Sequence, residues 1–250
     1  MKVIIAGELP YLDELGRLCV DCGHDTTLFL VEDFLTALES SRAIEDINDA
    51  DIVIEIHNES LATKQEVLLA LDNASPEETL FLTSALPCSA TQAASWVLNS
   101  SRVVGFGLLP PIEANGMVEL AQAMQTSEDS FAQAALFWEG LGYKSVVVSD
   151  GPGLVRARLV CCVINEAVTA LSEGVASERD IDKAMKLGTN YPYGPLEWAD
   201  IIGLDTVLGV MEGLFSEWGD DRYRPSPLLR RMVQAGRLGQ KVGEGFYAYD

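Results

Sequence analysis

Two histidines, His24 and His57, are the imidazole side chains of this 250-residue sequence, and they are the first candidates for a catalytic base. Imidazole suits proton transfer because its ordinary pKa lies close to neutral pH. His57 follows the apolar run 51–56 and precedes Glu59 by two residues, at a strand end where ligands bind in α/β sheets. His24 precedes a predicted strand, so we expect it in a surface turn. For His57 two interpretations stay open: a general base, or a histidine satisfied within a polar loop.

A second candidate site is the turn after the first apolar run, residues 2–6. Dinucleotide-binding domains carry G-x-G-x-x-G there, because glycines allow the backbone N–H groups to approach a pyrophosphate. This sequence reads GELPYL over residues 7–12, so only Gly7 matches. Leu9 adds bulk, Pro10 removes a backbone donor and Glu8 adds a negative charge. Leu30 stands where an acidic residue would hold the ribose hydroxyls.

These candidates require a parallel sheet that brings strand ends together. Short β-type apolar runs alternate with helical patterns in the first part of the chain, which predicts βαβ units and a doubly wound, Rossmann-like parallel sheet. The second part has helical patterns only, apart from a strand-like run at 245–249. We therefore predict a Rossmann-like domain over 1–148 and an all-helical domain over 149–250. The predicted strands are 2–6, 26–30, 51–56, 79–83, 103–106 and 145–148, and the main helices are 11–21, 62–71, 90–98, 127–141, 155–173, 178–187, 194–202, 205–218 and 227–235.

The charge of the chain excludes several kinds of partner. Lys and Arg number 17 against 38 Asp and Glu, a net charge of −21, and residues 1–148 hold six basic and 23 acidic residues. Such a surface disfavours nucleic acid and anionic membranes. The short apolar start does not resemble a signal peptide, and the five cysteines are odd in number, so we expect a cytoplasmic protein with reduced thiols. Cys19 and Cys22 lack further ligands nearby, so we expect no metal site.

The second half resembles the 3-hydroxyacyl-CoA dehydrogenase family, on six motifs in order and register. A weaker match continues through the first half, at 50–55, Glu59, Lys64, Arg102-x-x-Gly105 and Val118-Glu119. The resemblance implies a Rossmann-like NAD-binding domain followed by a helical dimerisation domain. The six motifs are GPGLV at 151–155, NEA at 165–167, DID-x-AM at 180–185, GPL-x-x-x-D at 194–200 with GLD at 203–205, PSP at 225–227, and K-x-GEGFY at 241–247.

The resemblance also identifies the positions that carry the family's chemistry, which is oxidation of a 3-hydroxyacyl thioester by NAD. Its catalytic histidine falls at Gly107, its serine at Leu86 and its asparagine at Ala157, so three polar groups are replaced. The glutamate that orients the histidine is retained as Glu119. Ser84 lies close enough to the serine position to be a candidate for that role.

The resemblance implies cofactor contacts as well. Glu59 and Lys64 match positions near the nicotinamide ribose, although a solvated acid–base pair is an equally good interpretation. Between residues 30 and 50 the family has a longer helix pair that clasps coenzyme A, and here a short acidic segment with Arg42 remains. The resemblance therefore implies NAD as cofactor and an acyl-CoA-like ligand, while the changed turn and the shortened segment count against binding of both.

Three functions remain open at this point. The first is a degenerate family member that lacks hydride transfer and acts by binding. The second is an active NAD-dependent 3-hydroxyacyl-CoA oxidoreductase of fatty-acid metabolism with non-standard residues, using His57 and Glu119. The third is a different enzyme on the same scaffold, with Glu119, His57 and Ser84 in its pocket. By resemblance we also predict a homodimer through residues 155–250.

Overall fold

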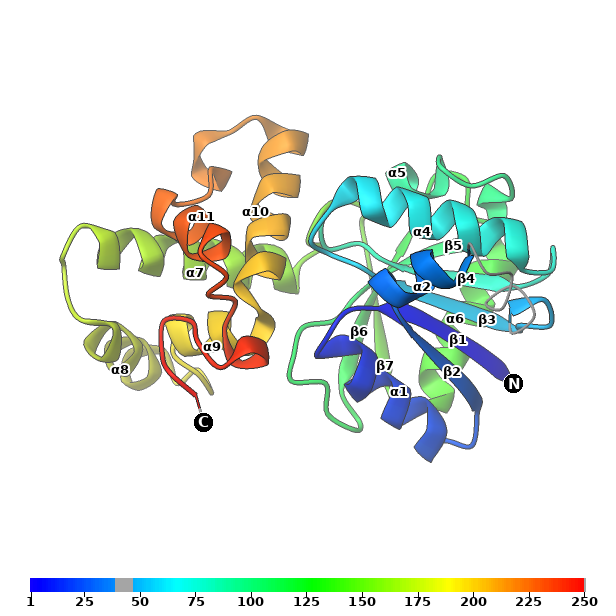
Figure 1. The fold of residues 1–250 in the computed structure, drawn as a ribbon, viewed down its shortest axis with the longest axis horizontal. Helices are drawn as coiled ribbons and strands as arrows, with labels where there is room; N and C mark the ends of the chain where they lie inside the picture. The colour runs from blue at the N-terminus through cyan, green and yellow to red at the C-terminus, as the bar shows by residue number, and fades with distance from the viewer. Residues whose placement is uncertain (39–46, 250) are drawn as a thin grey trace.

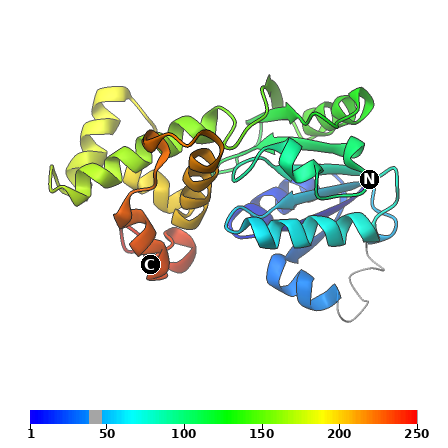
Figure 2. The ribbon, with the colours of Figure 1, turned by 90° about the horizontal axis from the view of Figure 1, so that it is seen from above.

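The computed structural model describes residues 1–38 and 47–249, and within these ranges the chain forms two lobes (Figure 1). We call the part from β1 to β7 (residues 2–148) the sheet lobe and the part from α7 to the C-terminal segment (residues 156–249) the helical lobe. Figure 2 shows the lobes side by side from above. The shortened acidic segment that contains Arg42 falls largely outside the described residues.

The sheet lobe contains seven strands in the order β2-β1-β3-β4-β5-β6-β7. All neighbouring strands are parallel except β5 and β6, which pair antiparallel. The Rossmann-like prediction is therefore confirmed, with one antiparallel pair inserted near the edge. The strands are β1 (Lys2–Gly7), β2 (Asp25–Leu30), β3 (Ile52–Ile56), β4 (Leu80–Ser84), β5 (Val103–Gly107), β6 (Met117–Gln122) and β7 (Lys144–Val148).

Helices cover both faces of this sheet because its central strands are apolar on both sides. On β1, Val3 and Ile5 pack into one buried cluster, whereas Ile4 and Ala6 pack into another. The first cluster includes side chains of α1 (Tyr11–Asp21) and α6 (Glu128–Gly140). The second includes side chains of α2 (Val31–Leu38), α4 (Leu61–Ala74) and α5 (Ala90–Ala94).

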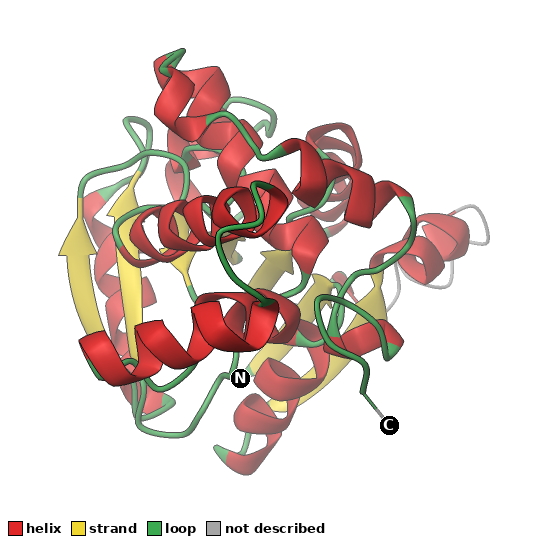
Figure 3. Ribbon diagram, turned by 90° about the vertical axis from the view of Figure 1, so that its left-hand side faces the viewer, coloured by secondary structure: helices red, strands yellow, loops and turns green. Residues whose placement is uncertain are grey.

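The helical lobe consists of α7 (Arg156–Ser172), α8 (Glu178–Thr189), α9 (Pro195–Ile202), α10 (Leu204–Trp218) and α11 (Pro227–Gln234). Helix α7 is the centre of the lobe, and α9, α10 and α11 pack on it. Figure 3 views the molecule from the side of this lobe, with strands of the sheet visible behind the helices. The predicted helices of this half are confirmed to within about two residues at each end.

The structure differs from the sequence prediction in several elements. Helix α2 was not predicted, and α5 ends at Ala94 rather than at residue 98. The run 245–249 is not a strand of a sheet: its pairing is limited to the single bridge between Glu244 and Ala248. Conversely, β6 was not predicted, because it follows a glycine-containing loop and carries Glu119 within an apolar run. The missed strand is the one that bears the family's retained glutamate.

Helix α10 packs closely against the loops at the carboxyl edge of the sheet. A side chain on Gly209 would lie 2.2 Å from the carbonyl oxygen of Asn58, which follows β3. A side chain on Gly213, one turn later, would lie 2.1 Å from the carbonyl oxygen of Pro87, which follows β4. The two glycines therefore let the helix pack directly on the loops where a ligand of an α/β sheet is bound.

Two buried carboxylates organise the motifs of the helical lobe. Asp182 accepts hydrogen bonds from the backbone N–H groups of Leu196 and Glu197, at 2.8 and 2.9 Å, and from the Tyr247 hydroxyl. Asp200 accepts bonds from the N–H groups of Phe246 and Tyr247, both at 2.9 Å. These acidic residues of the sequence motifs thus hold the start of α9 and the C-terminal segment, which is a structural role.

Candidate active site at the carboxyl edge of the sheet

The antiparallel pair β5–β6 places Gly107 directly opposite Glu119. Residues directly opposite in such a pair have neighbouring side chains on the same face. A histidine at position 107 would therefore face the Glu119 carboxylate, as a base and its orienting acid must. Here a Cβ atom on Gly107 would lie 3.3 Å from Glu119 Oε2 and 2.9 Å from the Leu154 side chain. Leu154 therefore lies where an imidazole ring would need room.

Leu86 and Ala157 stand at the positions matched by resemblance to the family's serine and asparagine. Each is 1% exposed, and both belong to the main hydrophobic cluster. Glu119 is 4% exposed and accepts two hydrogen bonds from the Arg156 N–H, at 3.0 and 3.1 Å. Burial raises the pKa of Glu119 above its ordinary value, and the hydrogen bonds from the backbone oppose that shift. The retained glutamate therefore caps the start of α7 in an apolar setting.

A separate polar network lies at the ends of β1, β3 and β4. The Glu8 carboxylate accepts hydrogen bonds from Asn58, from both its backbone N–H and its side-chain amide, at 3.2 Å. The Asn58 Oδ1 atom accepts a bond of 2.6 Å from the Ser84 hydroxyl. His57 Nδ1 lies 3.0 Å from Glu8 Oε2. The structure thus brings His57 and Ser84 into one buried network, while Glu119 lies on β6 with other contacts.

The His57 ring lies between Glu8 and the start of α4. Nε2 accepts a hydrogen bond of 3.2 Å from the Ser60 N–H, and Nδ1 lies 3.0 Å from Glu8 Oε2 without a hydrogen bond of normal geometry. The side chain of His57 is 9% exposed. A general base needs a free lone pair within reach of a substrate proton. In this arrangement the Ser60 N–H occupies the Nε2 lone pair.

The turn after β1 does not fit a pyrophosphate. Leu9 is 40% exposed and lines a crevice beside the turn. The Asn58 N–H already donates a hydrogen bond to the Glu8 carboxylate. Pro10 has no N–H, and Glu14, in the first turn of α1, already accepts the Ile112 N–H at 2.9 Å. An anion bound there would need free N–H groups and no competing charge. Gly7 is required by packing, since a Cβ would lie 3.0 Å from the Ile56 carbonyl oxygen.

The crevice beside this turn is a cavity of about 520 Å³ with an acidic lining. Four carboxylates line it, and Lys241 is the cation among the described residues at its wall. Leu30, at the end of β2, also lines the crevice. It stands at the position where an acidic residue would hold the ribose hydroxyls. The four acids are Glu8, Glu32, Asp33 and Glu59.

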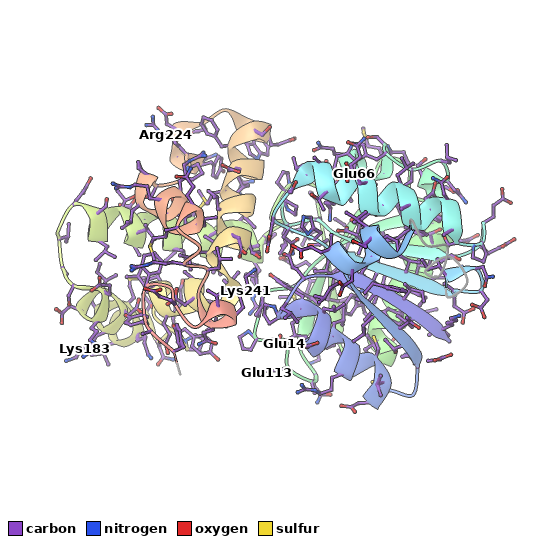
Figure 4. The ribbon with its side chains drawn as sticks, in the orientation of Figure 1. Glu14, Glu66, Glu113, Lys183, Arg224 and Lys241 are labelled. Carbon is purple, nitrogen blue, oxygen red and sulfur yellow. The ribbon has the colours of Figure 1, made fainter. Side chains whose placement is uncertain are left out.

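Lys64 and Glu59 occupy different environments. The Lys64 side chain is fully buried, and its ammonium group donates to the equally buried Glu55, which also accepts a bond from Thr83. Lys64 therefore balances an internal carboxylate. Glu59 instead reaches the other lobe: its carboxylate accepts a 2.8 Å bond from Lys241, which also pairs with Asp205. Figure 4 labels Lys241 at the junction between the lobes.

Within residues 1–38 and 47–249, no three His, Cys, Asp or Glu side chains form a group suited to a metal ion. Over the same ranges, no helix combines the length and the apolar character needed to cross a bilayer.

Comparison with known protein families agrees with the fold. Residues 153–249 match the 3-hydroxyacyl-CoA dehydrogenase C-terminal domain, and residues 25–151 match the 3-hydroxyacyl-CoA dehydrogenase NAD-binding domain. The chain belongs to the 3-hydroxyacyl-CoA dehydrogenase family. The second match begins at residue 25, so it leaves out β1, the altered turn and α1.

Similar proteins and structures extend over nearly the whole chain. A probable 3-hydroxybutyryl-CoA dehydrogenase of Bacillus subtilis is 40% identical, over 88% of this chain and 77% of its own. One from Deinococcus radiodurans is 39% identical, over 99% and 86%. Among solved structures, Mycobacterium tuberculosis FadB2 has a TM-score of 0.82 at 27% identity, covering 99% and 98%. The Ralstonia eutropha (S)-3-hydroxybutyryl-CoA dehydrogenase PaaH1 has a TM-score of 0.76 at 32%, covering 100% and 99%.

Sequence reasoning missed how Asn58 organises the polar network. The residue is fully buried and connects Ser84 to Glu8, although nothing in its local pattern distinguishes it from a loop asparagine. Its position between His57 and Glu59, directly after a buried strand, was the available signal. Glu8 was noted for its charge, but its contacts depend on the end of another strand about fifty residues later in the chain.

Proposed function

We propose that this chain is a family member that has lost hydride transfer between NAD and 3-hydroxyacyl-CoA, and that it acts by binding. The observation that carries the proposal is the absence of polar side chains at three positions around Glu119. Gly107 has no side chain to act as a base, and the side chains of Leu86 and Ala157 cannot form a hydrogen bond with a substrate oxygen. Leu154 takes up the space opposite Glu119. Without a base, the proton of a substrate hydroxyl has no acceptor in this centre.

The altered turn supports the same proposal for the cofactor. A pyrophosphate would meet the Glu8 carboxylate and the Leu9 side chain, and the acidic crevice would repel it. We therefore propose that NAD does not bind in the family's manner. Of the residues singled out earlier, Gly7, Glu59 and Lys64 then have structural roles, Glu119 caps a helix, and His57 and Ser84 belong to the buried network.

Titration of the purified protein with NADH, followed by acetoacetyl-CoA, tests this proposal. We expect no saturable change of nicotinamide fluorescence at micromolar protein and no oxidation of NADH. A Glu8→Ala/Leu9→Gly variant should gain NADH affinity by about tenfold or more, since it removes a charge and a steric block. Turnover by the unaltered chain above that of the Glu119→Gln variant would overturn the proposal.

Active dehydrogenation is the second candidate function. It is favoured by the 40% identity to a protein named probable 3-hydroxybutyryl-CoA dehydrogenase and by the retained Glu119. It requires a base other than residue 107, and His57 would need to leave Ser60 and Glu8. A His57→Gln variant that abolished a measured turnover would support it. A third possibility, a different enzyme on this scaffold, requires a substrate that bridges Glu119 and the Ser84–His57 network.

We also propose a homodimer through residues 155–250, with domains at 1–148 and 149–250. Large apolar side chains of the helical lobe remain exposed in a single chain, which supports burial against a second copy. Light scattering after size exclusion should give twice the chain mass, and a monomer at all concentrations would exclude the dimer. Within residues 155–249, the exposed large apolar residues are Val155, Leu159, Val175, Leu187, Tyr191, Trp218 and Val242.

A further inference from the structure

The crevice beside the altered turn has a charge opposite to the one that a dinucleotide requires. Four carboxylates line it, and Lys241 is the cation among the described residues of its wall. The Lys241 ammonium group already pairs with Glu59 and with Asp205. In the described part of the chain, no Lys or Arg side chain lies within 4.0 Å of the other three carboxylates. These three acids are Glu8, Glu32 and Asp33.

Glu8 is a buried carboxylate of this wall that has no cation beside it. Its side chain is 10% exposed, and it accepts hydrogen bonds from the backbone N–H and the side-chain amide of Asn58, which are both neutral. His57 Nδ1, 3.0 Å away, has no hydrogen-bond partner, and an imidazole whose Nε2 accepts a bond carries no charge. Buried charges in proteins are normally paired with an opposite charge. The crevice wall therefore contains a buried carboxylate whose counter-charge the described residues do not supply.

The acids are distributed along the crevice rather than gathered at one position. Glu8 lies in the turn after β1, Glu32 and Asp33 lie in the first turn of α2, and Glu59 lies between β3 and α4. Within residues 1–38 and 47–249, no three acidic, His or Cys side chains converge closely enough to hold a metal ion. A ligand with several separated positive charges matches this distribution better than a single metal ion does.

Apolar side chains complete the lining of the crevice. Leu9 and Leu30 are 40% and 41% exposed, and Val31 and Leu35 also line the wall. Methylene groups that cover such side chains gain free energy by leaving water. The volume of about 520 Å³ suits a small molecule. An alkyl chain that carries ammonium groups meets both the apolar and the acidic parts of this lining.

We infer that the crevice binds an aliphatic polyamine, a small organic cation whose ammonium groups are joined by methylene chains. One ammonium group pairs with Glu8, another with Glu32 and Asp33, and the methylene chain lies against Leu9 and Leu30. The inference rests on the proposed function, because the crevice is open to a polyamine only if NAD does not occupy it. It names the class of ligand that a family member without hydride transfer would bind.

Calorimetric titration of the purified chain with spermidine tests the inference, at about 150 mM NaCl to screen the general attraction of a chain of charge −21. Mg²⁺ and octane-1,8-diol are the comparison probes, since the first has charge without an alkyl chain and the second an alkyl chain without charge. We expect saturable binding of spermidine and of neither comparison probe. Glu8→Gln should weaken spermidine binding by about tenfold or more, because it removes the buried charge and keeps the shape.

Two double variants of equal charge separate a site from the general field of the chain. Glu32→Gln/Asp33→Asn changes the crevice, whereas Glu66→Gln/Glu139→Gln changes exposed acids of α4 and α6 that do not line it. Figure 4 labels Glu66 on α4. The crevice variant should lose about fivefold or more in spermidine affinity, and the control should stay within about twofold. All four positions of these two variants are exposed, so both variants remain informative if Glu8→Gln fails to fold.

The outcomes distinguish this inference from the proposed function. Absence of both spermidine and NADH binding would overturn the inference alone. Micromolar binding of NADH would overturn the proposed function and the inference with it. Equal losses in the two double variants, unchanged affinity in a folded Glu8→Gln chain, or binding of Mg²⁺ as tight as that of spermidine would each overturn the inference.

Discussion

The two lobes place their ion pairs differently. In the sheet lobe, Lys64 pairs with Glu55 and Arg102 with Asp72, and all four side chains are at most 6% exposed. Within the helical lobe, five ion pairs of the described residues are exposed, with each side chain 35% exposed or more. The pair of Lys241 and Asp205, at the junction with the sheet lobe, is the buried exception among them, with side chains 13% and 6% exposed. Two cations of the sheet lobe are thus paired in its interior, whereas most ion-paired cations of the helical lobe among the described residues lie at its surface.

This difference makes the surface of the sheet lobe more acidic. Residues 1–148 contain only six basic residues, and two of them form ion pairs with buried carboxylates. The remaining acids, including Glu32 and Asp33 at the crevice, are left with few cations to balance them. A scarcity of surface cations, rather than acidic residues alone, therefore makes the sheet lobe unfavourable for a polyanionic ligand. The following predictions test the comparison.

The largest effect is expected at Lys64. Lys64→Met leaves Glu55 buried without its cation, and we expect it to lower the free energy of unfolding by roughly 3–5 kcal/mol. Urea denaturation followed by circular dichroism measures this loss. The double variant Lys64→Met/Glu55→Gln should recover much of it. A loss below about 1 kcal/mol would mean that the pair is not effectively buried.

The next effect is expected at the closed centre. Gly107→His must displace the Leu154 side chain, and we expect a destabilisation of about 1–3 kcal/mol because the site is fully packed. Adding Leu154→Ala should reduce that cost, and Leu154→Ala alone provides the matched control. Thermal unfolding of the four chains gives the coupling energy. Independent effects of the two substitutions would show that Leu154 does not occupy this space.

A smaller effect concerns pH at the junction between the lobes. Burial, together with the hydrogen-bonding Glu59, raises the pKa of Asp205 from 3.8 to about 6. Between these values the folded chain holds a proton that the unfolded chain has released, so stability falls as pH rises through this window. Lowering the pH from 7 to 5 should therefore stabilise the unaltered chain by about 1 kcal/mol more than Asp205→Asn. Equal shifts in both would contradict the assignment.

The smallest effect is expected at the surface of the helical lobe. Arg230 and Glu212 form a pair with both side chains more than 40% exposed. Arg230→Ala should change the free energy of unfolding by less than about 1 kcal/mol, and salt should reduce the change further. Chemical denaturation at two salt concentrations measures it. A change as large as that of Lys64→Met would remove the contrast between the lobes.

Much of the fold could be predicted from the sequence because its elements have strong local patterns. Helix α1, for example, begins and ends at the predicted residues, since its apolar positions repeat at helical spacing and Gly23 follows its end. Strand β6 was not predicted because its six residues include a buried glutamate and pair with β5 in antiparallel order. Pairing direction depends on distant segments, so local pattern could not supply it.

The sequence matched Gly107 and Glu119 to the family's base and its orienting glutamate by resemblance alone. The β5–β6 register places these two residues opposite each other. The network of Glu8, Asn58 and Ser84 was not predictable, because it joins the ends of three strands through side-chain conformations.

The contact between Glu59 and Lys241 joins residues 182 positions apart, and it therefore sets an order of events during synthesis. A chain emerging from the ribosome folds its N-terminal part first. Glu59 is then present long before its cation, and the sheet lobe must hold its shape with that carboxylate still in water. Lys241 can reach Glu59 and Asp205 only after it has itself been synthesised and has left the ribosome. A nascent chain that stops shortly before residue 241 would carry a finished sheet without this link between its lobes.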